Sequence, residues 1–170
     1  MCTVALRCGG QACIYYFDNI NGAAVSDLTS NSNFPNNPTS TVSITSGAFE
    51  SKHRNLENYG VLMEGFVVAP HTGSYTFSVD SDDASEVWAA KSPNALDMAG
   101  DMLKVVEQPG CCAKITGTVS VVWSANQRYY VKVLMKEATG THTGCETIHN
   151  VRPDKHGLDL LAIRRDDPVF

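Results

Sequence analysis

Apolar residues occupy every second position in a series of short segments, and this pattern constrains the fold more than any other feature. Tyr75, Phe77 and Val79 alternate with small polar residues, as is typical of a strand with one buried face. Clusters of Pro, Gly and Asn separate the β-rich segments, which cover residues 13–17, 41–45, 61–68, 74–80, 86–90, 102–107, 116–123, 128–136 and 146–149. The spacing predicts an all-β, antiparallel β-sandwich or jelly-roll-like barrel.

The residues between these segments predict one hairpin, one long loop and two short helical stretches. Pro70 and Gly73 supply turn angles between residues 61–68 and 74–80, so these two segments are predicted to form a hairpin. Residues 19–47 are rich in Asn, Ser, Thr, Pro and Gly, which disfavours a helix and predicts a long surface loop. The helical pattern is confined to residues 50–58 and 95–101.

Length and charge bound the class of protein. With 170 residues the chain can bury one core, and we expect an N-terminal arm at 1–12, a sandwich at 13–150 and a C-terminal arm or added strand at 151–170. The net charge of −5 and the scattered basic residues argue against a nucleic-acid partner. No apolar run is long enough to predict a membrane span.

The cysteine content predicts disulfide bonds and therefore an oxidising compartment. An extracellular protein follows, whether secreted, on the cell surface or in the matrix. We expect two of the three N-terminal cysteines to bond to cysteines of the later group, whereas a bond within the adjacent pair is disfavoured by its strained ring. Free buried cysteines are the alternative. The six residues are Cys2, Cys8, Cys13, Cys111, Cys112 and Cys145.

Three aspartates lie within four positions, at Asp80, Asp82 and Asp83, between two apolar patterns. Adjacent carboxylates repel one another, so such a loop implies a cation, a donor-rich partner or full hydration. In the alternative interpretation, the loop is a tight turn in which the carboxylates accept hydrogen bonds from backbone N–H groups.

Four segments resemble the protective-antigen-type domain, or PA-fourteen domain. They are Tyr-Gly-Val-Leu-Met-Glu-Gly-Phe at 59–66, Ala-Pro-His-Thr-Gly-Ser-Tyr-Thr-Phe at 69–77, Ser-Asp-Asp-Ala-Ser-Glu-Val-Trp at 81–88 and Tyr-Tyr-Val-Lys-Val-Leu-Met-Lys-Glu at 129–137. Their order and spacing over residues 14–150 carry the resemblance. This family occurs in fungal adhesins, fibrocystin-like surface proteins, bacterial toxins and glycosidases. The resemblance implies an antiparallel β-sandwich with Asp82 and Asp83 on a loop at one end.

The resemblance also implies a site. In the adhesin branch, paired aspartates joined by a cis peptide bond hold a calcium ion that also binds sugar hydroxyls, and Asp82 and Asp83 match these metal ligands. The matching second loop, Thr139 to Thr143, contributes Thr141 and His142 as ligand-binding candidates and contains no carboxylate.

These observations predict an extracellular, non-enzymatic carbohydrate-binding and adhesion module, lectin-like, with glycans as partners and calcium as a cofactor. The alternative is a structural subunit of an extracellular fibre or matrix, a homo-oligomer assembled through the terminal arms at 1–10 and 158–170. A third interpretation is a carbohydrate-binding accessory to a catalytic domain.

Catalytic and zinc-binding functions are less favoured. The spacing of His142, Cys145 and His149 is not a standard zinc spacing. Carboxylates for glycoside hydrolysis are present at Glu64, Glu86 and Glu137, but the glycosidases of this family carry their chemistry on another domain.

Overall fold

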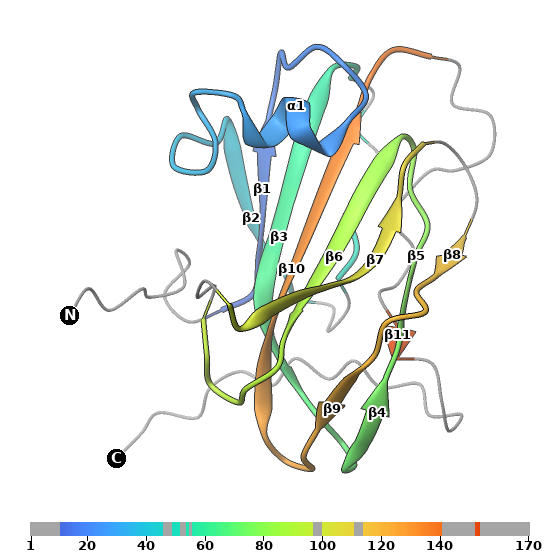
Figure 1. Ribbon diagram of the computed structural model, residues 1–170. Coiled ribbons are helices and arrows are strands. Elements are labelled where there is room, and N and C mark those ends of the chain that lie inside the picture. Colours follow the sequence, from blue (N-terminus) through green and yellow to red (C-terminus); the bar gives the residue numbers. More distant parts are fainter. Residues whose placement is uncertain are drawn as a thin grey trace.

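The computed structural model describes residues 11–45, 49–51, 54, 56–96, 100–110, 114–140 and 152–153, and within them the fold is built from antiparallel strands (Figure 1). The larger sheet has six strands in the order β2-β1-β3-β10-β6-β7, and every pairing in it is antiparallel. β3 and β10 lie at its centre and pair over ten residues each. The bounds are β1 Cys13–Phe17, β2 Ser40–Ser43, β3 Tyr59–Val68, β6 Ala84–Ala90, β7 Met102–Gln108 and β10 Arg128–Glu137.

Shorter strands form a second layer against this sheet (Figure 1). They belong to a three-stranded sheet in the order β11-β5-β8 and a two-stranded sheet of β4 and β9. The bounds are β4 Gly73–Tyr75, β5 Phe77–Val79, β8 Ile115–Thr116, β9 Val121–Trp123 and β11 Arg152–Pro153. The predicted antiparallel β-architecture is confirmed.

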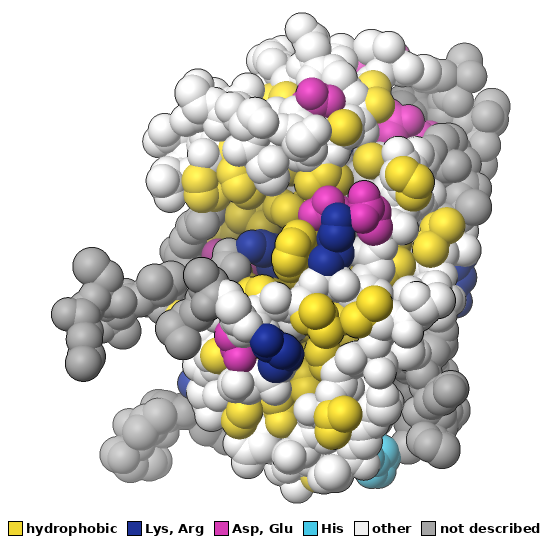
Figure 2. Space-filling model, viewed as in Figure 1, with side chains coloured by type: hydrophobic (Ala, Val, Ile, Leu, Met, Phe, Trp, Pro, Cys, Tyr) yellow, Lys and Arg dark blue, Asp and Glu magenta, His cyan; other side chains and the backbone are white. Residues whose placement is uncertain are grey.

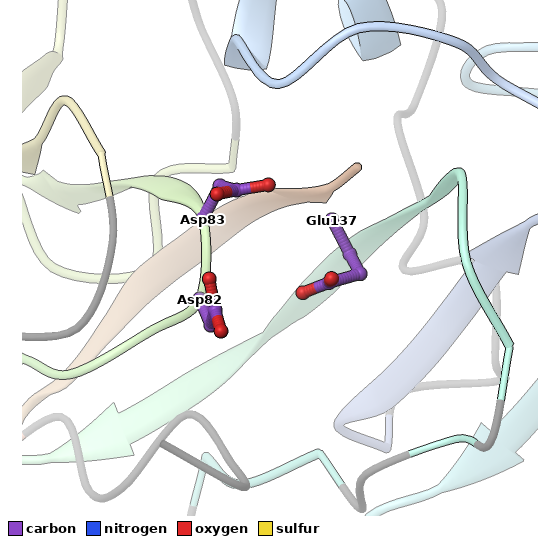
Figure 3. A group of neighbouring side chains, drawn as sticks. All are labelled: Asp82, Asp83 and Glu137. Carbon is purple, nitrogen blue, oxygen red and sulfur yellow. The ribbon is translucent and has the colours of Figure 1, made fainter. Parts of the chain in front are cut away.

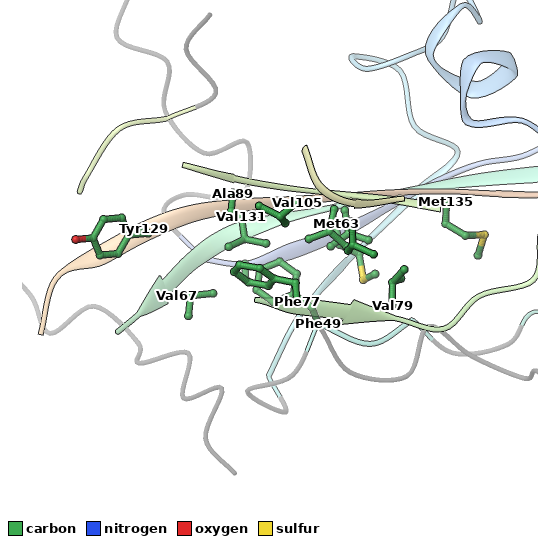
Figure 4. Close-up of a cluster of buried hydrophobic side chains, with 14 of the residues drawn as sticks. Phe49, Met63, Val67, Phe77, Val79, Ala89, Val105, Tyr129, Val131 and Met135 are labelled. Atoms are coloured by element: carbon green, nitrogen blue, oxygen red, sulfur yellow. The ribbon is translucent and has the colours of Figure 1, made fainter. Parts of the chain in front are cut away.

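The main core fills the space between the two layers (Figure 4). Trp123 of β9 is fully buried, stacks on Tyr129 of β10 with 4.6 Å between ring centroids, and meets the Phe77 ring edge-on at 5.5 Å. Because β10 residues at alternate positions share one face of the sheet, Tyr129, Val131, Val133 and Met135 all point into this core.

A second buried cluster lies on the opposite face of the six-stranded sheet, beneath helix α1 (Val25–Thr29). Val25 and Leu28, three positions apart, present one apolar face of this single turn to the sheet. Gly60 of β3 permits the contact, because a Cβ atom there would lie only 2.5 Å from Leu28 Cδ1. The helix therefore forms in a segment for which the composition predicts a loop: a tertiary contact overrides weak local propensity. In the described parts of 50–58 and 95–101, where the pattern predicts helix, there is none.

The predicted hairpin between residues 61–68 and 74–80 is wrong. β3 pairs with β1 and β10, whereas β4 pairs with β9 and β5 pairs with β8 and β11. The turn after β3 carries the chain from one layer to the other, and hydrogen bonds between Ala69 and the turn before β10 hold it there. Local turn residues indicated the reversal correctly but could not indicate the strand partners.

The structure bears on two further predictions. Cys13 is disulfide-bonded; the other five cysteines lie outside the described residues, so the pairing stays a prediction. Within the described ranges, no helix has the length and apolar character needed to cross a membrane.

The face of the six-stranded sheet that α1 partly covers presents hydrophobic side chains and charges of both signs (Figure 2). Basic groups on it lie beside acidic ones, as where Lys104 Nζ is 3.2 Å from Glu86 Oε1 and 2.6 Å from Glu107 Oε2. The positive charge of Lys104 is therefore balanced locally by two carboxylates.

Candidate metal centre

Three carboxylates meet at one end of the sandwich (Figure 3). Asp82 and Asp83 lie on the loop that joins β5 to β6, and Glu137 is the last residue of β10. Each contributes a carboxylate oxygen, and these oxygens all lie within 4.8 Å of one another. The group therefore combines a loop with the end of a central strand that is remote in sequence.

Backbone hydrogen bonds place the loop beside β10. The Asp83 N–H donates to the Lys136 carbonyl oxygen at 3.0 Å, and the Ala138 N–H donates to Asp83 Oδ2 at 2.9 Å. The Asp82-Asp83 peptide bond is cis, as the resemblance to the family implies. The loop thus continues the β6–β10 pairing past its last ladder residues, Ala84 and Lys136.

Glu137 is 4% exposed, and its surroundings disfavour its charged form. Burial raises the pKa of the Glu137 carboxyl to about 7, with further contributions from the Asp82 and Asp83 carboxylates and only partial relief from Lys136. Burial also raises the pKa of the neighbouring Tyr59 to about 12, and the Glu137 charge adds to this effect. A cation at this point would relieve the repulsion among the three carboxylates.

Lys136 is fully buried next to this group. It lies on the sheet face of Leu134, in the direction of α1, and its Nζ donates to the Glu137 carbonyl oxygen at 2.5 Å. Burial lowers the pKa of the Lys136 ammonium, while Asp27, Glu137 and Asp83 oppose that shift. One ammonium thus faces several carboxylates, so the site as a whole stays acidic.

The donor set fits calcium better than a soft metal. All three side chains offer carboxylate oxygens, the ligands that calcium prefers, and neither a thiolate nor an imidazole is among them. Asp82 and Asp83 are half-buried, which leaves their side accessible to further oxygen ligands. Three carboxylates cannot complete a shell of about six to eight oxygens if each binds through one atom, so further ligands have room.

The structure describes only some of the site residues that the sequence predicts. Asp82 and Asp83 both lie in the group of three carboxylates. Thr141, His142 and the residues considered for zinc, Cys145 and His149, lie outside the described residues.

Glu137 is the member that sequence reasoning missed as a ligand. The second loop lacks a carboxylate, but the strand residue just before that loop supplies one. The alternation from Tyr129 to Met135 could have found it, because it places Glu137 on the same face at the strand end.

The other two glutamates considered for glycoside hydrolysis lie outside this group. Glu64 accepts a hydrogen bond from the Tyr130 hydroxyl at 2.6 Å. Glu86 accepts one from Trp88 Nε1 at 2.8 Å. The structure therefore gives these two carboxylates other partners.

Comparison with known proteins establishes the family. The family model of the PA14 domain, the protective-antigen-type domain of the sequence analysis, matches residues 14–161. The chain belongs to the PA14 domain family. The resemblance carried by the four sequence segments is thereby confirmed.

One relative of this PA14 domain is a much larger protein. The mouse N-acetyl-beta-glucosaminyl-glycoprotein 4-beta-N-acetylgalactosaminyltransferase 1 is 33% identical over 135 residues, which are 75% of this chain and 13% of the transferase. The chain therefore spans a small part of that relative.

Two solved structures share the fold at low identity. The epithelial adhesin 9 A domain from Candida glabrata, in complex with Galβ1-4GlcNAc, has a TM-score of 0.53 and 12% identity, with 83% of this chain and 78% of that chain covered. A beta-glucosidase from Kluyveromyces marxianus in complex with glucose has a TM-score of 0.54 and 11% identity, with 89% of this chain but 17% of that chain covered. At these identities the likeness shows the fold alone.

Proposed function

We propose that this PA14 domain is an extracellular, non-enzymatic carbohydrate-binding module whose glycan site is built around a calcium ion. The observation that carries the proposal is the meeting of Asp82, Asp83 and Glu137 within 4.8 Å at one end of the sandwich. Thr141 and His142, in the chain segment that follows Glu137 and Ala138, are proposed as further glycan-binding residues.

The three carboxylates would hold the ion, and the ion would accept vicinal sugar hydroxyls in place of water. The protein's own part is to fix the carboxylates. Hydrogen bonds to the backbone of Lys136 and Ala138 set the position of Asp83, and burial restricts Glu137 to the end of β10. Preorganised oxygens reduce the entropic cost of binding both ion and sugar.

Two comparisons support a glycan ligand without identifying it. The Candida glabrata adhesin domain carries Galβ1-4GlcNAc on this fold. The mouse relative at 33% identity is named for the transfer of N-acetylgalactosamine to a glycoprotein glycan. One protein binds a glycan and the other is named for modifying one, which makes a carbohydrate the first ligand class to test.

Glycan-array binding with and without calcium tests the proposal. We expect chelation by EGTA to abolish binding of the wild-type chain, and Asp83→Asn to weaken it at least about tenfold, because a liganding charge and an acceptor are lost. Asp101→Asn makes the same chemical change at the opposite end, where β6 connects to β7, and should leave binding unchanged. Binding that survives both chelation and Asp83→Asn would exclude the calcium-assisted site.

A second candidate is a glycan-binding accessory within a larger glycan-processing enzyme. The observation that favours it is the match to 13% of the mouse transferase. In that arrangement the PA14 domain would hold the glycan and a separate domain would carry out the chemistry. Deletion of the module from the full-length protein should then raise KM for glycoprotein acceptors while kcat stays unchanged; an unchanged KM would contradict it.

A further inference from the structure

The loop that carries Asp82 and Asp83 is also held from the side opposite β10, by a buried glutamine. Gln108, the last residue of β7, is 2% exposed, and its amide makes two hydrogen bonds to the backbone of Ser81. The Ser81 N–H donates to Gln108 Oε1 at 3.1 Å, and Gln108 Nε2 donates to the Ser81 carbonyl oxygen at 3.0 Å. The side chain thus pairs with Ser81 as a neighbouring strand would.

The Ser81 hydroxyl extends this contact across the loop. Its Oγ lies 3.0 Å from Gln108 Oε1, 2.7 Å from Ser85 Oγ and 3.2 Å from the Asp83 carbonyl oxygen. Ser81 and Ser85 flank the aspartate pair, and both are at most 1% exposed. One buried hydroxyl therefore joins the two ends of the loop to the backbone of the second aspartate.

The aspartate pair is consequently fixed on two sides. The backbone of Lys136 and Ala138 holds it from β10, and Gln108 holds it from β7. Gln108 closes the β6–β7 ladder opposite Ser85, so its position is set by regular strand pairing. Repulsion between adjacent carboxylates tends to open such a loop, and a satisfied buried network opposes that opening.

We infer that Gln108 is a positioning residue for the metal centre: it holds Asp82 and Asp83 in the arrangement that binds the ion, without touching the ion itself. The inference rests on the proposed function, because positioning Asp82 and Asp83 matters for binding only if they hold an ion. An amide of this length is needed because Ser81 presents both a donor and an acceptor, and a glutamate or methionine at 108 cannot satisfy both.

The experiment compares Gln108→Met with the full wild-type chain, first without calcium. Hydrogen exchange of the Asp83 N–H, followed by NMR, reports directly on the loop. We expect exchange of the Asp83 N–H to accelerate about tenfold or more. In the wild type, opening of the loop must break the hydrogen bonds of Gln108, and in the variant this cost of opening is absent. Amides in the centre of β3 should keep their protection. Unchanged exchange at Asp83 would overturn the inference whether or not the chain binds calcium.

Calcium affinity, measured by titration calorimetry, is the second measurement. We expect Gln108→Met to weaken calcium binding about tenfold, the usual effect of losing a group that orients metal ligands. Tyr75→Phe is the control, because it removes a 2.6 Å hydrogen bond from the Tyr75 hydroxyl of β4 to the His71 carbonyl oxygen of the preceding turn. β4 lies at the opposite end of the sandwich (Figure 1). Its calcium affinity should equal that of the wild type even if it unfolds at a lower temperature.

If Gln108→Met does not fold, Ser85→Ala is the second variant in which exchange of the Asp83 N–H is measured. It removes the 2.7 Å contact with the Ser81 hydroxyl and retains the Gln108 bonds, so we expect a smaller acceleration of Asp83 exchange in the same direction. Wild-type exchange in Ser85→Ala would show that the buried network around Ser81 does not restrain Asp83, which overturns the inference. Calcium affinity reduced equally by Gln108→Met and Tyr75→Phe would assign Gln108 a general structural role. Absence of calcium binding by the wild type would instead contradict the proposed function and leave the exchange result to decide the positioning.

Discussion

Glu137→Gln is expected to weaken calcium binding by roughly 30-fold or more. The substitution keeps the size of the side chain but removes one of the three charges that converge within 4.8 Å. Loss of one partner of a buried charge interaction costs about 2 to 5 kcal/mol, and each 1.4 kcal/mol corresponds to about a tenfold change in affinity. Titration calorimetry of the purified chain with calcium chloride measures the effect.

Glu57→Gln is the control for this experiment. Glu57 is exposed, and its charge acts on Glu137 without being one of the three clustered carboxylates. Its replacement changes the net charge by the same amount, so a purely long-range electrostatic effect would reduce affinity similarly in both variants. We expect less than about a threefold change, as for other solvent-screened charges. Equal losses in the two variants would remove Glu137 from the ligand set.

The calcium-free protein is expected to lose stability as the pH rises from about 4.5 to above 7. The pKa of Glu137 is raised from 4.5 to about 7 in the folded chain, chiefly by burial and then by Asp82 and Asp83. The folded state therefore holds the Glu137 proton more tightly than the unfolded state does. The resulting stabilisation is complete below the unfolded pKa and is lost as the pH passes through the folded pKa. Urea denaturation at a series of pH values, with EGTA present, measures it.

Other titrating groups contribute to the same pH range, so the comparison is with Glu137→Gln. That variant cannot titrate at position 137, and its stability should fall less across this interval than that of the wild type. Saturating calcium should flatten the wild-type curve, because the ion binds the ionised carboxylates of the folded state. Parallel curves for the two proteins without calcium would contradict the proton-binding account of Glu137.

The acidic loop was predictable because its signals are local. Tyr75, Phe77 and Val79 define a strand by alternation, and apolar residues resume at Val87, so the aspartates between them had to lie on a connection. The resemblance carried by the four family segments then implied that this loop lies at one end of a sandwich. The structure places Asp82 and Asp83 accordingly.

Contacts between distant segments were not predictable in this way. Glu137 joins the site only because β6 and β10 pair in the register Ala84 to Lys136, and strand register depends on the whole sheet. Helix α1 forms because Leu28 packs against Gly60 of β3, which has no side chain to block the contact. The expected hairpin failed for the same reason, since turn residues specify a reversal but do not specify the sheet that each strand joins.

Because Glu137 lies at the end of β10, the placement of the carboxylates and the sequence of the segment after the strand can evolve independently. Glu137 is still paired with Tyr59 of β3 as the last residue of β10, whereas residues 139 and 140 lie beyond the sheet and are exposed. Substitutions or changes of length beyond that point leave the carboxylate donors in place. A lineage carrying this domain could therefore change the residues that follow β10 while it keeps the three carboxylates of the proposed site in place.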